Sequence, residues 1–142
     1  MENTSANTHI RVLLVDDEAV PRQVTERAFR HGGYDVTVAT NGHEALARVE
    51  QSPTPFDLFV VDSVMPAMKG PELAERIRQR QPDAKILFLT GFTDTLFSPT
   101  KRTLDVNQAF LQKPSSLKGL LEAASLLLFG HTRGLQNESQ LQ

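Results

Sequence analysis

Four apolar runs along the chain are each followed by residues that could take part in chemistry. Asp16 and Asp17 come after the first run, and later runs end at Asp62, Thr90 and Lys113. Crowded carboxylates raise one another's pKa unless a cation lies among them, and Mg²⁺ is a hard cation that prefers oxygen ligands. With a carboxylate as nucleophile, such a metal, an ammonium and a hydroxyl would stabilise the oxygens of a phosphoryl group in transfer. The residue types therefore predict phosphoryl transfer, if the fold brings them together.

The elements that must position these residues alternate between strands and helices. Short apolar or β-branched runs predict strands at residues 10–15, 34–39, 56–61, 85–89 and 109–112. Helical spacing of apolar residues predicts helices at residues 18–31, 44–51, 70–81, about 99–104, and a last one that ends at 129 and is capped by Ser115 or Ser116. This alternation favours an α/β fold in which helices cover both faces of a parallel sheet.

The order of the elements also predicts where a site would lie. In open parallel sheets, ligands bind beyond the carboxyl ends of the strands, near the point where the strand order reverses. Each chemically useful residue named above stands at the carboxyl end of an expected strand. We therefore expect three carboxylates, a hydroxyl and an ammonium to converge on one surface.

Composition is that of an ordinary globular protein. The chain has 142 residues, of which 39% are hydrophobic and 23% charged, and its formal net charge of -2 gives no general reason to expect a nucleic acid or an acidic membrane as partner. The absence of cysteine excludes disulfides, thiolate chemistry and cysteine-ligated zinc. We expect a cytoplasmic protein with a flexible arm at 1–9, one domain at 10–129 and a flexible tail at 130–142.

Four motifs carry a resemblance to a known family. They stand in order at expected strand ends and read VLLVDDE at 12–18, DSVMPAMKG at 62–70, LTG at 89–91 and FLQKP at 110–114. Through them the chain resembles the receiver domain of two-component response regulators, from residue 10 to about 129. It is similar both to single-domain, chemotaxis-regulator-like receivers and to the C-terminal receivers of hybrid histidine kinases. The resemblance implies a flavodoxin-like (βα)5 fold, a doubly wound sheet of five parallel strands with helices on both faces.

The resemblance further implies an acceptor residue and a metal site. Asp62 would take a phosphoryl group from a phosphohistidine on a histidine kinase or a histidine phosphotransfer protein. Mg²⁺ would be bound by Asp17, Asp62 and the backbone carbonyl of Val64, while Asp16 would act through a bound water.

Other residues are assigned by the same resemblance to switching. Thr90 and Lys113 would contact the phosphoryl oxygens, and Phe110 would turn inward as Thr90 moves toward the phosphoryl group. The face made by the expected helix near 99–104, the strand at 109–112 and the last helix would then change shape. Phe92, which is bulky and stands two residues after Thr90, is expected to hinder attacking water and so prolong the life of the phosphoryl group.

The last expected helix is more apolar than one core-facing stripe requires, because leucine, alanine and phenylalanine fill most of residues 117–129. We expect this helix to contribute to a homodimer or to docking of a kinase. Contact with partner proteins would be the output, without direct contact to a nucleic acid or a membrane.

Other interpretations of the same residues stay open. The acids at 16–18 could simply favour a helix N-terminus, Lys113 could belong to a surface turn, and Thr90 and Phe110 could be packing residues. A receiver-like binding module that is never phosphorylated is one alternative function. A Mg²⁺-dependent phosphatase with an aspartyl nucleophile is another, although such enzymes carry a second acid two residues later, where this chain has Val64. We expect no enzymatic turnover beyond self-phosphotransfer and slow autodephosphorylation.

Overall fold

The computed structural model describes residues 9–91, 107–113 and 116–130. In this part of the chain, five parallel strands form one sheet in the order β2-β1-β3-β4-β5. The strands are β1 (Arg11–Val15), β2 (Asp35–Ala39), β3 (Leu58–Asp62), β4 (Ile86–Thr90) and β5 (Gln108–Gln112). The helices in the described residues are α2 (Ala19–His31), α3 (Gly42–Gln51), α4 (Gly70–Arg80) and α6 (Leu117–Phe129).

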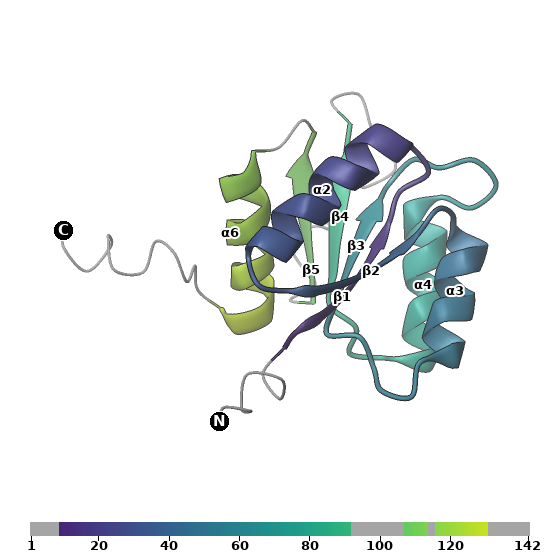
Figure 1. Ribbon diagram of the computed structural model, residues 1–142. Coiled ribbons are helices and arrows are strands. Elements are labelled where there is room, and N and C mark those ends of the chain that lie inside the picture. The colour runs from purple at the N-terminus through teal and green to yellow at the C-terminus, as the bar shows by residue number, and fades with distance from the viewer. Residues whose placement is uncertain (1–8, 92–106, 114–115, 131–142) are drawn as a thin grey trace.

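The helices lie in two layers, with α2 and α6 on one face of the sheet and α3 and α4 on the other (Figure 1). Strand β1 shows why both faces are apolar, because successive side chains point to opposite sides. Val12 and Leu14 belong to the core under α2 and α6, whereas Leu13 and Val15 belong to the core under α3 and α4. The expected flavodoxin-like, doubly wound α/β fold is confirmed.

The strand order reverses between β1 and β3. The chain runs from β1 to β2 on one side and then returns to add β3, β4 and β5 on the other. The carboxyl ends of β1 and β3 therefore flank the switch point, where open α/β sheets bind their ligands. This is the feature of the fold that positions the site.

Local signals fix the ends of the helices. The hydroxyl of Ser116 caps α6 by accepting a bond of 2.9 Å from the Gly119 amide, and Gly130 ends the helix in the left-handed conformation with a φ of 81°. Helix α2 carries Pro21 in its first turn, where the missing amide hydrogen does no harm.

Two expectations need comment. Helix α3 begins at Gly42, two residues earlier than expected, because the Asn41 side chain accepts a bond of 2.8 Å from the Glu44 amide and caps the helix. The helix expected near 99–104 and Phe92 lie outside the described residues. Within the described ranges, every helix falls short of the length and apolar content needed to cross a bilayer.

Candidate functional site

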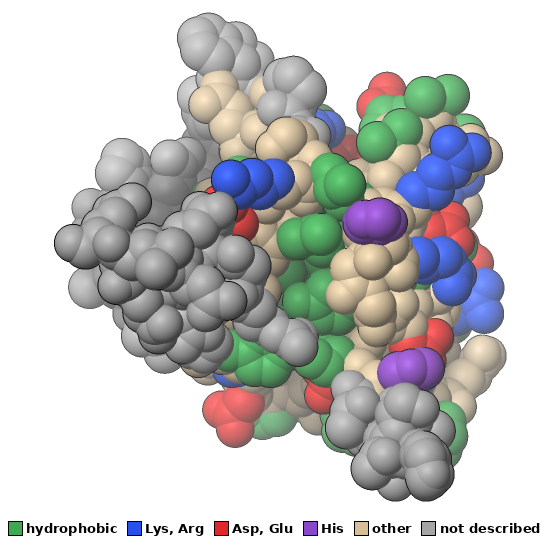
Figure 2. Space-filling view, turned by 60° about the vertical axis from the view of Figure 1, so that its left-hand side comes forward, with side chains coloured by type: hydrophobic (Ala, Val, Ile, Leu, Met, Phe, Trp, Pro, Cys, Tyr) green, Lys and Arg blue, Asp and Glu red, His purple; other side chains and the backbone are tan. Residues whose placement is uncertain are grey.

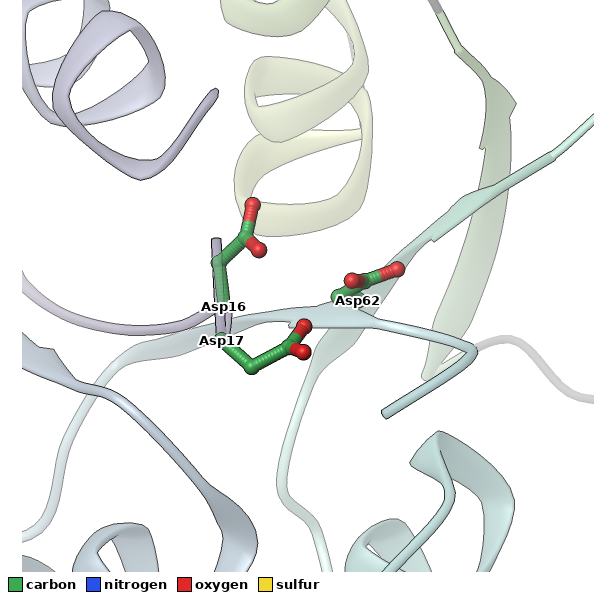
Figure 3. Close-up of side chains that lie close together, drawn as sticks. All are labelled: Asp16, Asp17 and Asp62. Carbon is green, nitrogen blue, oxygen red and sulfur yellow. The ribbon is translucent and has the colours of Figure 1, made fainter. Parts of the chain in front are cut away.

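Three carboxylates meet beside the switch point, at the carboxyl end of the sheet. Asp16 and Asp17 follow β1 directly, Asp62 is the last residue of β3, and these two strands are hydrogen-bonded neighbours. One carboxylate oxygen from each residue lies within 4.8 Å of the others. Figure 3 shows the Asp16 carboxylate turned to a different side from that of Asp17, as expected for successive residues leaving a strand. The structure thus brings together the three acids that the sequence placed at strand ends.

Two of the three acids are buried. Only 1% of Asp16 and 2% of Asp62 is exposed, and burial raises the pKa of both carboxyl groups because it disfavours the charged form. In Asp16, Oδ1 accepts a bond of 3.0 Å from the Glu18 amide, while Oδ2 is buried without a partner among the described residues. A buried carboxylate oxygen without a partner is unfavourable. The acid cluster is therefore suited to receive a cation or a water that a cation holds.

Lys113 supplies a positive charge from the end of β5. Its Nζ donates to Oδ1 of Asp62 at 3.0 Å, and its backbone amide donates to the Thr90 carbonyl at 2.7 Å. Burial lowers the pKa of this ammonium, but the hydrogen bond and attraction of Asp62 outweigh it, so that the net pKa is raised. The pKa of Asp62 is also raised, because desolvation of its carboxylate outweighs the stabilisation of the charged form by Lys113. Shifted pKa values in a buried pair of this kind are common at functional sites.

Thr90 ends β4 and is 7% exposed. It lies opposite Gln112 of β5, one residue before Lys113, while the residue before it, Leu89, lies opposite Asp62 of β3. The hydroxyl of Thr90 is thus carried on the strand between the acceptor candidate and the lysine candidate, at the same end of the sheet.

Phe110 and Val64 differ in their surroundings. Phe110 is partly buried in β5 and stacks on Phe88, with ring centroids 5.2 Å apart and planes 17° from parallel. Val64 is 52% exposed, and its amide donates to Oδ1 of Asp62 at 3.4 Å. Their expected roles in switching and in metal binding stay predictions.

Sequence reasoning did not single out Gly70, the first residue of α4. A Cβ placed there would come 2.8 Å from the Cα of Ser63 and 3.0 Å from the carbonyl oxygen of Asp62, closer than side-chain carbons approach a backbone. The Gly70 amide donates to the Ser63 carbonyl at 3.0 Å. The glycine lets α4 start against the backbone of the acceptor candidate, and the only signal in the sequence was its place at the end of the motif at 62–70.

The donor set fits Mg²⁺. This ion takes few carboxylates, favours oxygen ligands and shares its remaining positions with water and phosphate oxygens. Asp17, which is partly exposed, offers its carboxylate beside those of the buried Asp16 and Asp62, and Oδ2 of Asp16 has no partner among the described residues. Among the described residues, no other group of three histidine or acidic side chains has the spacing of a metal site.

Comparison with known proteins gives consistent matches. The family model of the response regulator receiver domain matches residues 12–125. The sensor kinase CckA of Brucella abortus is 38% identical over 117 residues, which make up 82% of this chain but 12% of that protein. The receiver protein CpdR of the same organism is 36% identical over 118 residues, 83% of this chain and 96% of that protein.

Solved structures agree with the sequence matches. The chemotaxis protein CheY4 of Vibrio cholerae superposes with a TM-score of 0.73 and 30% identity, covering 85% of this chain and 100% of that one. The receiver domain of the hybrid histidine kinase CckA superposes with a TM-score of 0.67 and 32% identity, covering 83% of this chain and 98% of that one.

Proposed function

Because the chain belongs to the response regulator receiver domain family, we propose that it accepts a phosphoryl group on Asp62 from a phosphohistidine of a partner protein. The observation that carries the proposal is the contact of 3.0 Å between Lys113 Nζ and Asp62 Oδ1 inside a cluster of three carboxylates. A buried carboxylate paired with a lysine and surrounded by metal-binding oxygens is equipped to be a nucleophile. Membership of the family supports the more general statement that this chain takes part in response regulator signalling.

The transfer is a displacement at phosphorus. Oδ1 of Asp62 is engaged by Lys113 and by the Val64 amide, so we assign Oδ2 as the attacking atom. The Oδ2–P bond forms while the N–P bond of the phosphohistidine breaks, and the imidazole nitrogen keeps the electron pair and takes up a proton. Mg²⁺, held by Asp17, Asp62 and the Val64 carbonyl with Asp16 acting through water, would supply charge neutralisation of the phosphoryl oxygens.

Two further residues act on the transferred group in this proposal. Lys113 leaves Asp62 Oδ1 for a phosphoryl oxygen, which keeps its ammonium paired with negative charge. The Thr90 hydroxyl donates to another phosphoryl oxygen, and this pull is the start of the conformational switch in which Phe110 turns inward. The stacking of Phe110 on Phe88 would be the contact that changes.

A phosphodonor has an apolar cleft through which to approach. A cleft of about 430 Å³ between α2 and α6 reaches from Asp16 and Lys113 to Val20, Val24 and Leu120. A second cleft of about 320 Å³ continues along the same two helices and is lined by Val24, Arg27, Ala28, His31, Leu117 and Leu120. Figure 2 shows hydrophobic side chains gathered in a strip on this side of the molecule. We propose that a helix of the histidine kinase or phosphotransfer protein docks here.

The output is contact with another protein. Leu126 and Phe129 on α6 are 53% and 40% exposed, so this helix offers apolar side chains to a partner. A homodimer through the face that includes β5 and α6 is the arrangement we propose. The proposed location is the cytoplasm, with no direct contact to a nucleic acid or a membrane.

The test is the mass of the intact protein after incubation with Mg²⁺ and acetyl phosphate, a small phosphodonor. We expect one added phosphoryl group that disappears when the metal is chelated and in the variant Asp62→Asn. A folded protein that gains no phosphoryl group in a time course begun within seconds would favour the alternative, a binding module that works without phosphorylation.

A further inference from the structure

The loop between β3 and α4, residues 63–69, begins next to Asp62 and contains a strained turn. Ala67 has a φ of 69°, the only positive value among the described residues that are not glycine. The Met68 amide donates to the carbonyl of Pro66 at 2.6 Å, which closes a three-residue turn around Ala67. Such turns with a positive central φ are rare and unfavourable for residues with a Cβ. Other contacts must therefore hold this loop in place.

The turn is held by packing of the Met68 side chain against Gly42. Met68 is 2% exposed, and it packs against Gly42, the first residue of α3. A Cβ on Gly42 would lie 2.6 Å from Met68 Sδ and 3.1 Å from Met68 Cβ, so the side chain rests directly on helix backbone. Asn41 caps the same helix start, which makes this backbone a fixed surface.

The loop is thus anchored where its side chains are buried and free where they are not. Met65 and Met68 belong to the core beneath α3 and α4, whereas Val64 and Pro66 are exposed. On one side of Val64, the buried Ser63 is held by bonds from its amide to the Leu89 carbonyl and from the Gly70 amide to its own carbonyl, both of 3.0 Å. On the other side, the two buried methionines hold the loop.

We propose that Met68, through its packing against Gly42, is a positioning residue for the acceptor site. In this proposal it fixes the loop that carries the Val64 carbonyl, the backbone group assigned above as a ligand of Mg²⁺. The start of α3, which contributes no group to the site, thereby sets the affinity for the divalent cation. The proposal rests on the proposed function, because it concerns the metal site assigned there.

Gly42→Ala is the direct test, because the added methyl group displaces Met68 without touching the carboxylates. We expect the Kd for Mg²⁺ in a calorimetric titration to rise about tenfold, the loss typical when the support of a metal ligand is altered. In the metal-free protein we expect faster amide hydrogen exchange at residues 64–68 than in the parent chain. Met68→Ala removes the side chain that packs against Gly42 instead of displacing it. We expect the same two changes in this variant.

Ala47→Gly is the matched control. Ala47 is exposed in the same helix, so glycine there weakens α3 by about the usual helix penalty without reaching Met68. Its Kd for Mg²⁺ is expected to equal that of the parent chain, which separates positioning from a general loss of stability.

The outcomes distinguish this inference from the function beneath it. If the parent chain binds Mg²⁺ in a way that Asp17→Asn abolishes, the metal site stands. Unchanged affinity in both Gly42→Ala and Met68→Ala would then overturn the positioning role alone. Equal losses in these variants and in Ala47→Gly would also overturn it, because affinity would then follow helix stability. If the parent chain binds no Mg²⁺, the metal site fails, and the positioning role fails with it.

Discussion

At the scale of single residues, Asp16 shows what the site contributes to stability. Its pKa is raised, chiefly by burial, so the folded protein binds its proton more tightly than the unfolded chain does. Stability therefore falls as the pH rises from about 3.8 through the raised pKa of the folded state. We expect Asp16→Asn to raise the free energy of unfolding of the metal-free protein at pH 8, with a smaller difference at pH 4. Urea unfolding in a chelator measures both, and a less stable variant at pH 8 would contradict this.

Ala67 offers a second prediction at this scale. Relief of its positive φ in Ala67→Gly is worth about 1 kcal/mol, and the greater freedom of glycine in the unfolded chain offsets about half of that. We expect a net gain of about 0.5 kcal/mol in urea unfolding. Gly33→Ala is the reverse change, since Gly33 has a φ of 92° and no neighbour near its added Cβ, and by the same two effects it should lose about 0.5 kcal/mol. Equal stability of all three proteins would show that φ is not the cause.

The residues that could be predicted are those whose place follows from the strands. Asp16, Asp62, Thr90 and Lys113 stand where short apolar runs end, and the carboxyl ends of parallel strands meet at one edge. The packing of Met68 against Gly42 could not be predicted. It depends on a contact between the loop after β3 and the start of α3, which no spacing along the sequence records.

At the scale of elements, the start of α3 shows the limit of turn signals. The pair of Asn41 and Gly42 is common in turns, yet Asn41 accepts from the Glu44 amide, and Glu44 accepts from the Thr40 amide at 2.7 Å. These two bonds begin the helix two residues earlier than apolar spacing alone indicated. In the described residues, the other expected strands and helices lie within two residues of their expected ends, and the central strands β1, β3 and β4 are the ones buried as nearly continuous runs.

Helix α2 carries a prediction about partner choice. Val24 is 56% exposed and lines both clefts between α2 and α6. We expect Val24→Glu to slow phosphoryl transfer from a phosphohistidine protein about tenfold, the effect of losing a modest hot spot, while acetyl phosphate still modifies Asp62 at the parent rate. Gln23→Glu adds the same charge to the same helix outside the clefts and is the control. A docking surface elsewhere would leave both variants equal to the parent chain.

At the scale of the whole molecule, the metal should stabilise the fold. An ion that binds only the folded state raises the free energy of unfolding by about 2.7 kcal/mol at a hundred times its Kd. We expect Mg²⁺ to raise the thermal midpoint of the parent chain and to leave that of Asp17→Asn nearly unchanged. A similar rise in both proteins would mean that the ion acts elsewhere.

The family relation also bears on the whole molecule. The chain matches nearly all of CpdR but 12% of the sensor kinase CckA, so receivers of this kind occur both alone and inside longer proteins. What they share is the receiver fold, in which the two core layers hold the ends of β1 and β3 side by side. The proposed acceptor site lies at the carboxyl end of that frame, between β1 and β3.

The central claim is that Asp62 carries the phosphoryl group, and its most direct test is to locate the group in the chain. Reduction of the phosphorylated protein with borohydride converts an aspartyl phosphate to homoserine, which fragment masses place at one residue. We predict homoserine at position 62, in amounts that require Mg²⁺. Homoserine at Asp16 or Asp17, or a phosphoryl group stable to borohydride on a hydroxyl such as that of Thr90, would contradict the account.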